Sequence, residues 1–126
     1  DPFKINTLNV ESYCERIRSG RLATALTLRF TRRQRMVYWL FWTAYSTRVN
    51  ADDFEAFFGV PLKKMYGMEL WLAKRLGFVT EHGSTYEMTL KGAFFYHYYE
   101  NFYTLSYIDK MWGILREEAF PESIEL

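Results

Sequence analysis

The most constraining feature of this sequence is a change in hydrophobic spacing close to residue 77. Before that point, apolar residues recur at the three- and four-residue intervals of amphipathic helices. From Phe78 to Thr89 they alternate instead, and the dipeptide Gly83-Ser84 interrupts the alternation. A glycine in the first position of a two-residue loop is typical of a type II′ β-hairpin. The sequence therefore predicts a mostly α-helical α+β chain with one small β-hairpin.

Four helices are predicted upstream of the hairpin from their start and stop signals. Asn50 has the side-chain oxygen that caps the first amide groups of a helix, and Gly20 and Gly77 allow the left-handed conformation that ends one. Between the first two helices, Arg21–Phe30 has mixed apolar spacing and is predicted to be an irregular connector. The predicted helices are Asn9–Ser19, Thr31 to about Ser46, Ala51–Phe58 and Pro61–Leu76.

The apolar spacing within two of these helices predicts which side of each faces the core. In the second helix, the spacing of one buried face is followed by Met36, Val37, Leu40, Phe41 and Ala44. In the fourth helix, one side is shared by Leu62, Met65, Glu69, Leu72 and Leu76. We expect both faces to be covered by the rest of the domain.

After the hairpin, Thr89 is predicted to cap a long helix from Leu90 to about Glu118, with Gly113 as the expected point of interruption. Its aromatic residues form two rows. The row expected to face the core comprises Phe94, Tyr98, Phe102 and Leu105, and the second comprises Tyr96, Tyr99, Tyr103 and Tyr107. A helix with two apolar faces is either buried on both or presents one to a partner. The second row is therefore either a cover for the domain's own surface or a docking face.

The aromatic content supports a search for a partner. Phe, Tyr and Trp make up 20% of the 126 residues. A chain of this length forms roughly one domain, whose interior has limited room. We therefore expect something outside this chain to cover some of the aromatic rings.

The order helix, helix, turn, helix, hairpin, helix is that of a winged-helix domain with an added N-terminal helix and an extended C-terminal helix. We expect the N-terminal helix and its connector to occupy residues 1–30, and the winged-helix-like domain residues 31–104. Residues 105–126 would form a C-terminal helical extension, and all three parts would make one compact unit.

The helix and hairpin that contact DNA in many winged helices lack suitable residues here. The fourth helix contains no Asn, Gln, Ser or Thr, and its one arginine, Arg75, is at its end. Lys63 and Lys64 are point charges that suit phosphate. The hairpin carries Glu81 and Glu87 and no Lys or Arg, so phosphates would repel it. These features argue against nucleic-acid binding.

A cluster of arginines precedes and begins the second helix, at Arg29, Arg32, Arg33 and Arg35. Cations at a helix start are disfavoured by the helix dipole. One interpretation is a solvated helix end. The other is a site for an anion or an acidic partner, because arginine forms paired hydrogen bonds with carboxylates.

No catalytic, cofactor-binding or metal-binding residues are predicted in this chain. Its single cysteine excludes a disulfide framework, a Cys-rich zinc site and a Cys-ligated iron–sulfur cluster within these residues. Cys14 lies in a predicted helix with too little positive charge to activate its thiol, and is interpreted as structural. His82 and His97 have no carboxylates at metal-ligand spacing, and no glycine-rich phosphate loop occurs.

The sequence also lacks export and membrane signals. The N-terminus lacks the basic segment, the apolar segment and the small-residue cleavage site that follow one another in a signal peptide, so no signal peptide is predicted there. The longest apolar run, Met36–Ala44, is far shorter than the ~20 residues that a membrane-spanning helix needs. With one lone thiol, these features favour a cytoplasmic setting. The absence of an initiating Met suggests a piece of a larger protein.

Several packing and turn segments together are similar to one family of enzymes. They are Tyr13, Ile17 and Gly20, then Thr31–Tyr45, Phe54–Gly59, Leu70 with Leu76–Val79, and Met88–Gly92. The last of these looks like the L-T-x-x-G segment with which the family ends its wing. Over residues 8–104 the chain resembles the C-terminal domain of the oxygen-independent coproporphyrinogen III oxidases (coproporphyrinogen dehydrogenases) and of their radical-SAM relatives.

This resemblance implies an accessory domain of an oxidoreductase. Such enzymes oxidatively decarboxylate propionate side chains of coproporphyrinogen III in haem and porphyrin biosynthesis. Their N-terminal radical-SAM barrel holds a [4Fe-4S] cluster and S-adenosylmethionine on a C-x-x-x-C-x-x-C motif, which is absent here. The C-terminal domain would act as a lid or wall beside the active site. The continuation from Thr104 to Leu126 departs from the family, some of whose members are haem chaperones or haem-utilisation proteins.

Two further possibilities stay open, a stand-alone winged-helix domain that binds nucleic acid and a protein-interaction domain without any enzyme. The resemblance favours an interdomain surface facing the barrel of the same polypeptide or a tetrapyrrole substrate. The candidate residues of that surface are Arg32, Arg33, Tyr96, Tyr99 and Tyr103.

Overall fold

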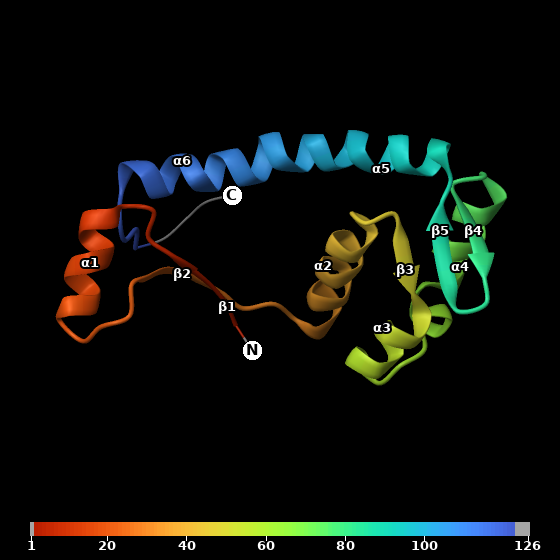
Figure 1. Cartoon of the computed structure of the whole chain (residues 1–126), viewed down its shortest axis with the longest axis horizontal. Coiled ribbons are helices and arrows are strands. Elements are labelled where there is room, and N and C mark those ends of the chain that lie inside the picture. Colours follow the sequence, from red (N-terminus) through yellow and green to blue (C-terminus); the bar gives the residue numbers. More distant parts are fainter. Residues whose placement is uncertain (1, 123–126) are drawn as a thin grey trace. The chain divides into compact units, whose positions relative to one another are not determined.

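The computed structural model describes residues 2–122, apart from the side chains of Thr104 and Tyr107. The prediction for Tyr107 and the end of the predicted extension at 123–126 therefore lie outside the described residues. The fold consists of helices and two small antiparallel sheets (Figure 1), which confirms the predicted α+β class. Packing divides the chain into two compact units, Arg32–Glu100 and the residues on either side of it. The domain ranges predicted from the sequence stay a prediction.

The unit formed by residues 1–31 and 101–126 contains a pair of antiparallel strands that was not predicted from the sequence. Strand β1 (Phe3–Asn6) pairs antiparallel with β2 (Thr24–Leu28), so the prediction of an irregular connector over Arg21–Phe30 is wrong. The two strands lie on either side of helix α1 (Val10–Arg18) in the chain, and pairing between segments so far apart leaves only a weak local signal. The predicted helix Asn9–Ser19 is confirmed, with Asn9 as its cap.

The unit Arg32–Glu100 carries the rest of the predicted elements. Its elements are α2 (Arg32–Ala44), β3 (Arg48–Asn50), α3 (Ala51–Phe58), α4 (Leu62–Arg75), β4 (Val79–His82), β5 (Thr85–Met88) and the first turns of α5 (Leu90–Tyr103). The predicted hairpin is β4 and β5. The unpredicted strand β3 pairs with β5, giving an antiparallel sheet in the order β3-β5-β4 (Figure 1).

Local signals act as predicted around the two short loops. The Asn50 side chain accepts hydrogen bonds from the amides of Asp52 and Asp53, and Gly59 ends α3 in the left-handed conformation. Pro61 is the N-cap of α4, so this helix begins at Leu62, one residue after its predicted start. Gly83 has φ +61, as the first position of a type II′ turn requires.

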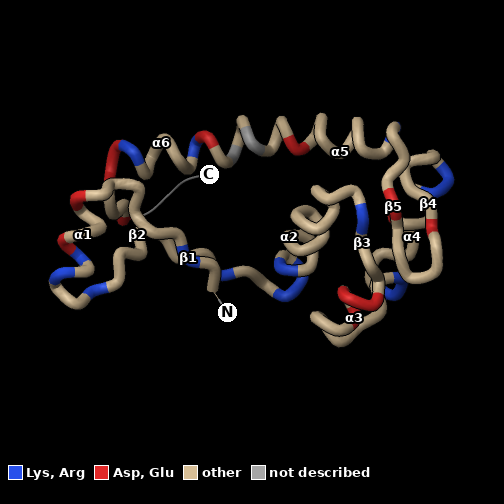
Figure 2. The backbone as a smooth tube through the Cα atoms, in the orientation of Figure 1, with Lys and Arg blue, Asp and Glu red and all other residues tan. Residues whose placement is uncertain are grey.

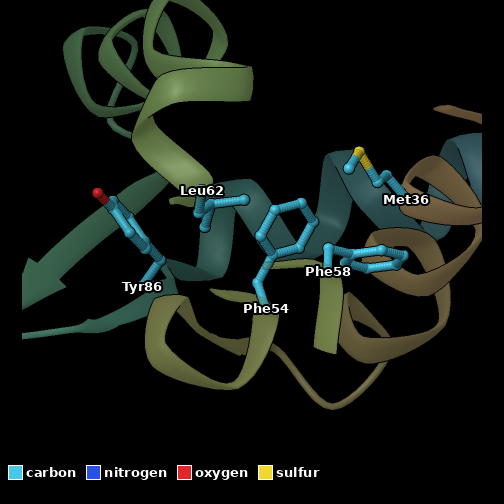
Figure 3. Packing of buried hydrophobic residues seen from close by; sticks show 5 residues of the cluster. All are labelled: Met36, Phe54, Phe58, Leu62 and Tyr86. Carbon is cyan, nitrogen blue, oxygen red and sulfur yellow. The ribbon is translucent and has the colours of Figure 1, made fainter. Parts of the chain in front are cut away.

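The core of this unit joins α2, α3, α4 and the sheet. Its buried side chains, drawn in Figure 3, are Met36, Phe54, Phe58, Leu62 and Tyr86. Phe54 is completely buried and its ring contacts the Trp39 ring edge-on, with centroids 5.6 Å apart. Burial of each large apolar side chain contributes about 1.5–3 kcal/mol. These contacts fix the position of α4 beside the hairpin.

Parts of the predicted buried faces are exposed. In α2, Met36 and Ala44 are buried, but Val37 is 52% exposed. In α4 the core is reached by Leu62, Tyr66 and Leu70, which recur every four residues. Of the residues that share one side of α4 by their spacing, only Leu62 is buried; the exposed ones are Met65, Glu69, Leu72 and Leu76.

The predicted long helix is three consecutive pieces. Helix α5 is followed by a π-helical turn, η1 (Thr104–Ile108), and by α6 (Asp109–Glu117). The interruption is therefore at Thr104–Ile108, and Gly113 lies inside α6. The row predicted to face the core is exposed instead, by 69%, 54%, 55% and 63% at Phe94, Tyr98, Phe102 and Leu105. Each helix of the described residues is too short or too polar to span a membrane.

Candidate functional site

An apolar groove on the unit Arg32–Glu100 is the clearest candidate for a functional site. Its volume is about 340 Å³. Its walls come from α2, α4, α5 and the hairpin, and consist of Phe41, Ala73, Phe78, Val79, Met88, Gly92, Phe95, Tyr96 and Tyr99. The volume is within the range of sites that bind small molecules or anchor side chains.

The start of α5 closes one end of this groove through backbone contacts with the hairpin. The Thr89 hydroxyl donates to the Gly77 carbonyl at 2.6 Å and accepts from the Gly92 amide at 3.1 Å, so the predicted Thr89 cap is confirmed. Gly92 is buried, and a Cβ atom there would lie 1.9 Å from the carbonyl oxygen of Phe78. Only glycine permits this approach, and it sets the direction in which α5 leaves the sheet.

Tyr96 joins α5 to α2 at the groove. Its hydroxyl donates a hydrogen bond to the Phe41 carbonyl, and the two rings are 5.5 Å apart. Burial, and then the charge of Glu100, raise the pKa of Tyr96 to about 12. The phenol therefore stays protonated and acts as a hydrogen-bond donor that anchors the helix.

The other two tyrosines of the predicted surface differ from Tyr96. Tyr99 lies on the rim of the groove and is 62% exposed, and its ring is tilted by 36° against that of Phe95, with the centroids 5.9 Å apart. Tyr103 is half-buried and ends α5, where the chain has passed into the other compact unit. Among the predicted tyrosines, only Tyr96 and Tyr99 line the groove.

The predicted arginines lie away from the groove. Arg32 donates a hydrogen bond from its guanidinium to the Phe58 carbonyl, at the negative C-terminal end of α3. Arg33 follows it at the start of α2 and is exposed. Phe41, which contacts Tyr96, is nine residues after Arg32 in the same helix, which corresponds to roughly 13 Å along the helix axis. The structure thus does not bring Arg32 and Arg33 together with Tyr96 and Tyr99.

The hairpin and α4 together form a compact cluster of charged residues that was not predicted from the sequence. Glu81 of β4 lies 2.5 Å from the ammonium groups of both Lys63 and Lys74 on α4. The Tyr86 hydroxyl also donates to this carboxylate, at 3.1 Å. The hydrogen bonds from Lys63 and Lys74 lower the pKa of Glu81 to about 2. Figure 2 shows acidic residues on both strands of the hairpin and basic residues on the adjoining helix α4.

This cluster changes the surface on which a winged helix would contact DNA. Two of the lysines in α4 share one carboxylate, which offsets one of their two positive charges and holds both side chains against the hairpin. On the other hairpin strand, Glu87 lies 3.4 Å from Arg48, whose charge it offsets. The described hairpin strands carry Glu81 and Glu87 and no Lys or Arg, so the hairpin offers none of the positive charge with which a wing contacts phosphates.

The isolated reactive side chains form no chemical site in the described residues. Cys14 is a free, half-buried thiol on α1. His82 is exposed at the tip of the hairpin, and His97 packs its ring against Tyr45 and Tyr96. Between residues 2 and 122, no three His, Cys, Asp or Glu side chains are grouped so that they could hold a metal ion.

A [4Fe-4S] cluster of the kind that the family resemblance implies does not fit the residues of this chain. Such clusters are held by several cysteine thiolates, whereas Cys14 is a single thiol.

Comparison of the chain with family models, with curated proteins and with solved structures finds no significant match.

Proposed function

We propose that this chain is a non-catalytic accessory domain that docks on a larger protein through the apolar groove between α2, α4 and α5. The observation that carries this proposal is the groove itself, an open and aromatic-lined hollow with no charged residue in its lining. Its rim residues Phe95 and Tyr99 are 42% and 62% exposed. Aromatic side chains of this kind are enriched at protein interfaces.

The fold proposed for the unit Arg32–Glu100 is winged-helix-like. In support, α2, α3 and α4 precede the hairpin β4–β5, and β3 lies between the first two helices in the chain and pairs with β5. A fold alone does not define a function, so the docking role rests on the groove and its surroundings.

The proposed partner is the radical-SAM barrel of an oxygen-independent coproporphyrinogen III oxidase-like enzyme of haem and porphyrin biosynthesis, in a reducing, cytoplasmic setting. Support comes from the sequence resemblance over residues 8–104, which includes the Met88–Gly92 segment. In the structure, Thr89 and Gly92 of that segment fix the start of α5. In the proposed complex, S-adenosylmethionine and the cluster belong to the barrel, and this chain forms a wall beside the substrate.

The test is association of this chain with the separately produced barrel of such an enzyme, followed by sedimentation velocity. We expect a one-to-one complex that Phe95→Glu weakens about tenfold or more, since a charge would enter the apolar groove. Phe57→Glu is the matched control, because Phe57 is 68% exposed and lies outside the groove. Association that is absent, or equal for both variants, would contradict the proposal.

A second arm addresses the substrate. Coproporphyrinogen is added to the complex, and its binding is compared for the wild type, Tyr99→Ala and Arg33→Ala. We expect both changes to weaken binding if these residues face the tetrapyrrole and its carboxylates. If both variants leave barrel association and tetrapyrrole binding unchanged, the predicted ligand-facing surface is wrong.

A further inference from the structure

The outward side of α4 carries a continuous apolar stripe that the groove does not include. The stripe consists of Met65, Met68, Leu72 and Leu76, which are 40%, 79%, 48% and 46% exposed. After the non-helical residue Tyr66 (φ −131, ψ 28), Met68, Leu72 and Leu76 recur every four residues and so lie on one side of α4, and Met65 directly precedes this kink. Trp71, 64% exposed, lies next to the stripe. Together they present on the order of 500 Å² of apolar surface, which is comparable to the largest apolar patch of a typical monomer, a patch that often has a function.

The charges beside this stripe are arranged asymmetrically. Arg75 lies three residues after Leu72 and therefore borders the stripe, whereas Lys64 lies near the start of α4, before the kink at Tyr66. Both are exposed, and neither has a carboxylate partner in the described part of the chain. Glu69 lies on the opposite edge. By contrast, Lys63 and Lys74 face the hairpin and are held by Glu81.

We propose that this stripe binds an amphipathic helix of the partner protein whose apolar side is bordered along one edge by carboxylates. The proposal rests on the docking function proposed above and specifies a second contact of the same partner. Apolar residues on one side of a helix fit a second helix laid along it. Methionine side chains adapt to the shape of a partner helix, and the free cations at Lys64 and Arg75 fix its orientation by pairing with acidic residues.

Other occupants fit the observations less well. In an antiparallel pair of two copies of this chain, the edges that carry Lys64 and Arg75 would meet and repel each other, and in a parallel pair the single carboxylate of Glu69 would face two cations. Nucleic acid would find two free cations and an apolar stripe in place of the polar side chains that read base edges. A helix with an acidic edge satisfies both the apolar residues and the cations.

The direct test uses two synthetic helical peptides of 21 residues (~three heptads), each with leucine at the first and fourth positions of every heptad. One peptide has glutamate along one edge of the leucine stripe, and the other has lysine at the same positions. Binding of each fluorescently labelled peptide to the full chain is measured by anisotropy. We expect the glutamate peptide to bind about tenfold or more tightly than the lysine peptide, with a difference that shrinks at high salt.

Three variants connect this preference to the stripe. Met68→Glu should abolish binding of the glutamate peptide, and Arg75→Glu should shift the preference toward the lysine peptide. Phe57→Glu is again the matched control and should leave both affinities unchanged. Circular dichroism verifies that each variant is folded, which we expect because all three side chains are exposed.

Several outcomes would overturn the inference. These are equal binding of the two peptides, binding that survives Met68→Glu, a dimer of the chain alone that Met68→Glu dissociates, and DNA binding that this change removes. The peptide test does not involve the barrel. Peptide binding without barrel association would therefore refute the proposed parent enzyme and keep the stripe, whereas the opposite result would refute the stripe alone.

Discussion

The two sides of α4 have nearly the same apolar character and different roles in the structure. The inward side places Leu62 in the core, where it is 1% exposed, and packs Tyr66 and Leu70 against it. The outward side presents Met65, Met68 and Leu72 to the surface. Hydrophobicity alone therefore does not identify the buried face of this helix. The two sides differ in burial because only the inward residues reach Phe54 and the sheet. Substitutions on each side test this difference.

The largest effect is expected on the inward side. Leu62→Ala would remove a fully buried side chain and leave a cavity next to Phe54 and Tyr86, at a cost of about 2–5 kcal/mol in the free energy of unfolding. Denaturant unfolding of the two proteins measures this difference. A loss below about 1 kcal/mol would show that the core is not formed as described.

The features of α4 and its surroundings that the sequence predicts correctly are local ones. Asn50 and Gly77 act within a few residues of themselves, by capping the start of α3 and by adopting a left-handed backbone after α4. The hairpin follows from Gly83 and from alternation on both sides of it. Such signals do not depend on the rest of the fold, so they can be recognised in one sequence.

The features that the sequence analysis missed depend on distant partners. Strand β3 is three residues long, too short for a recognisable alternation, and forms because Val49 pairs with Tyr86 across the sheet. The orientation of α5 depends on the close approach of Gly92 to Phe78 and on the bond from Tyr96 to α2. Aromatic residues surround α5 on several sides, and their spacing fits more than one buried face.

The next largest effect is expected at Glu81 of β4, whose carboxylate pairs with Lys63 and Lys74 of α4. The pKa of Glu81 is about 2 in the folded chain and 4.5 ordinarily, so the folded state binds a proton less readily than the unfolded state. The resulting stabilisation is complete above about pH 5 and is lost as the pH falls toward 2. Glu81→Gln should therefore lower the melting temperature at pH 7 and flatten its dependence on pH between these values.

Thermal unfolding at several pH values measures this effect, with Glu87→Gln as the control. Glu87 is on the same hairpin, but its side chain is 43% exposed and 3.4 Å from Arg48, so its ion pair contributes little. Parallel pH profiles for the wild type and Glu81→Gln would mean that the two lysines of α4 do not hold the carboxylate in solution.

A smaller effect of opposite sign is expected at Tyr66. Its ring packs edge-on against Phe54, while its hydroxyl is buried with no hydrogen-bond partner among the described residues. Tyr66→Phe keeps the ring and removes an unsatisfied polar group, so it should raise the free energy of unfolding by about 1 kcal/mol. Denaturant unfolding provides the measurement, and a loss of stability would reveal a partner for this hydroxyl.

The smallest effect on stability is expected on the outward side. Met68 is 79% exposed, and alanine is at least as good a helix former, so Met68→Ala should change the free energy of unfolding by less than about 0.5 kcal/mol. The same change should weaken binding of the acidic peptide, because the stripe loses its most exposed side chain. If Met68→Ala instead destabilises the chain as Leu62→Ala does, then Met68 is covered within the chain. The two sides of α4 would then be equivalent, and the stripe would have no surface left for a partner.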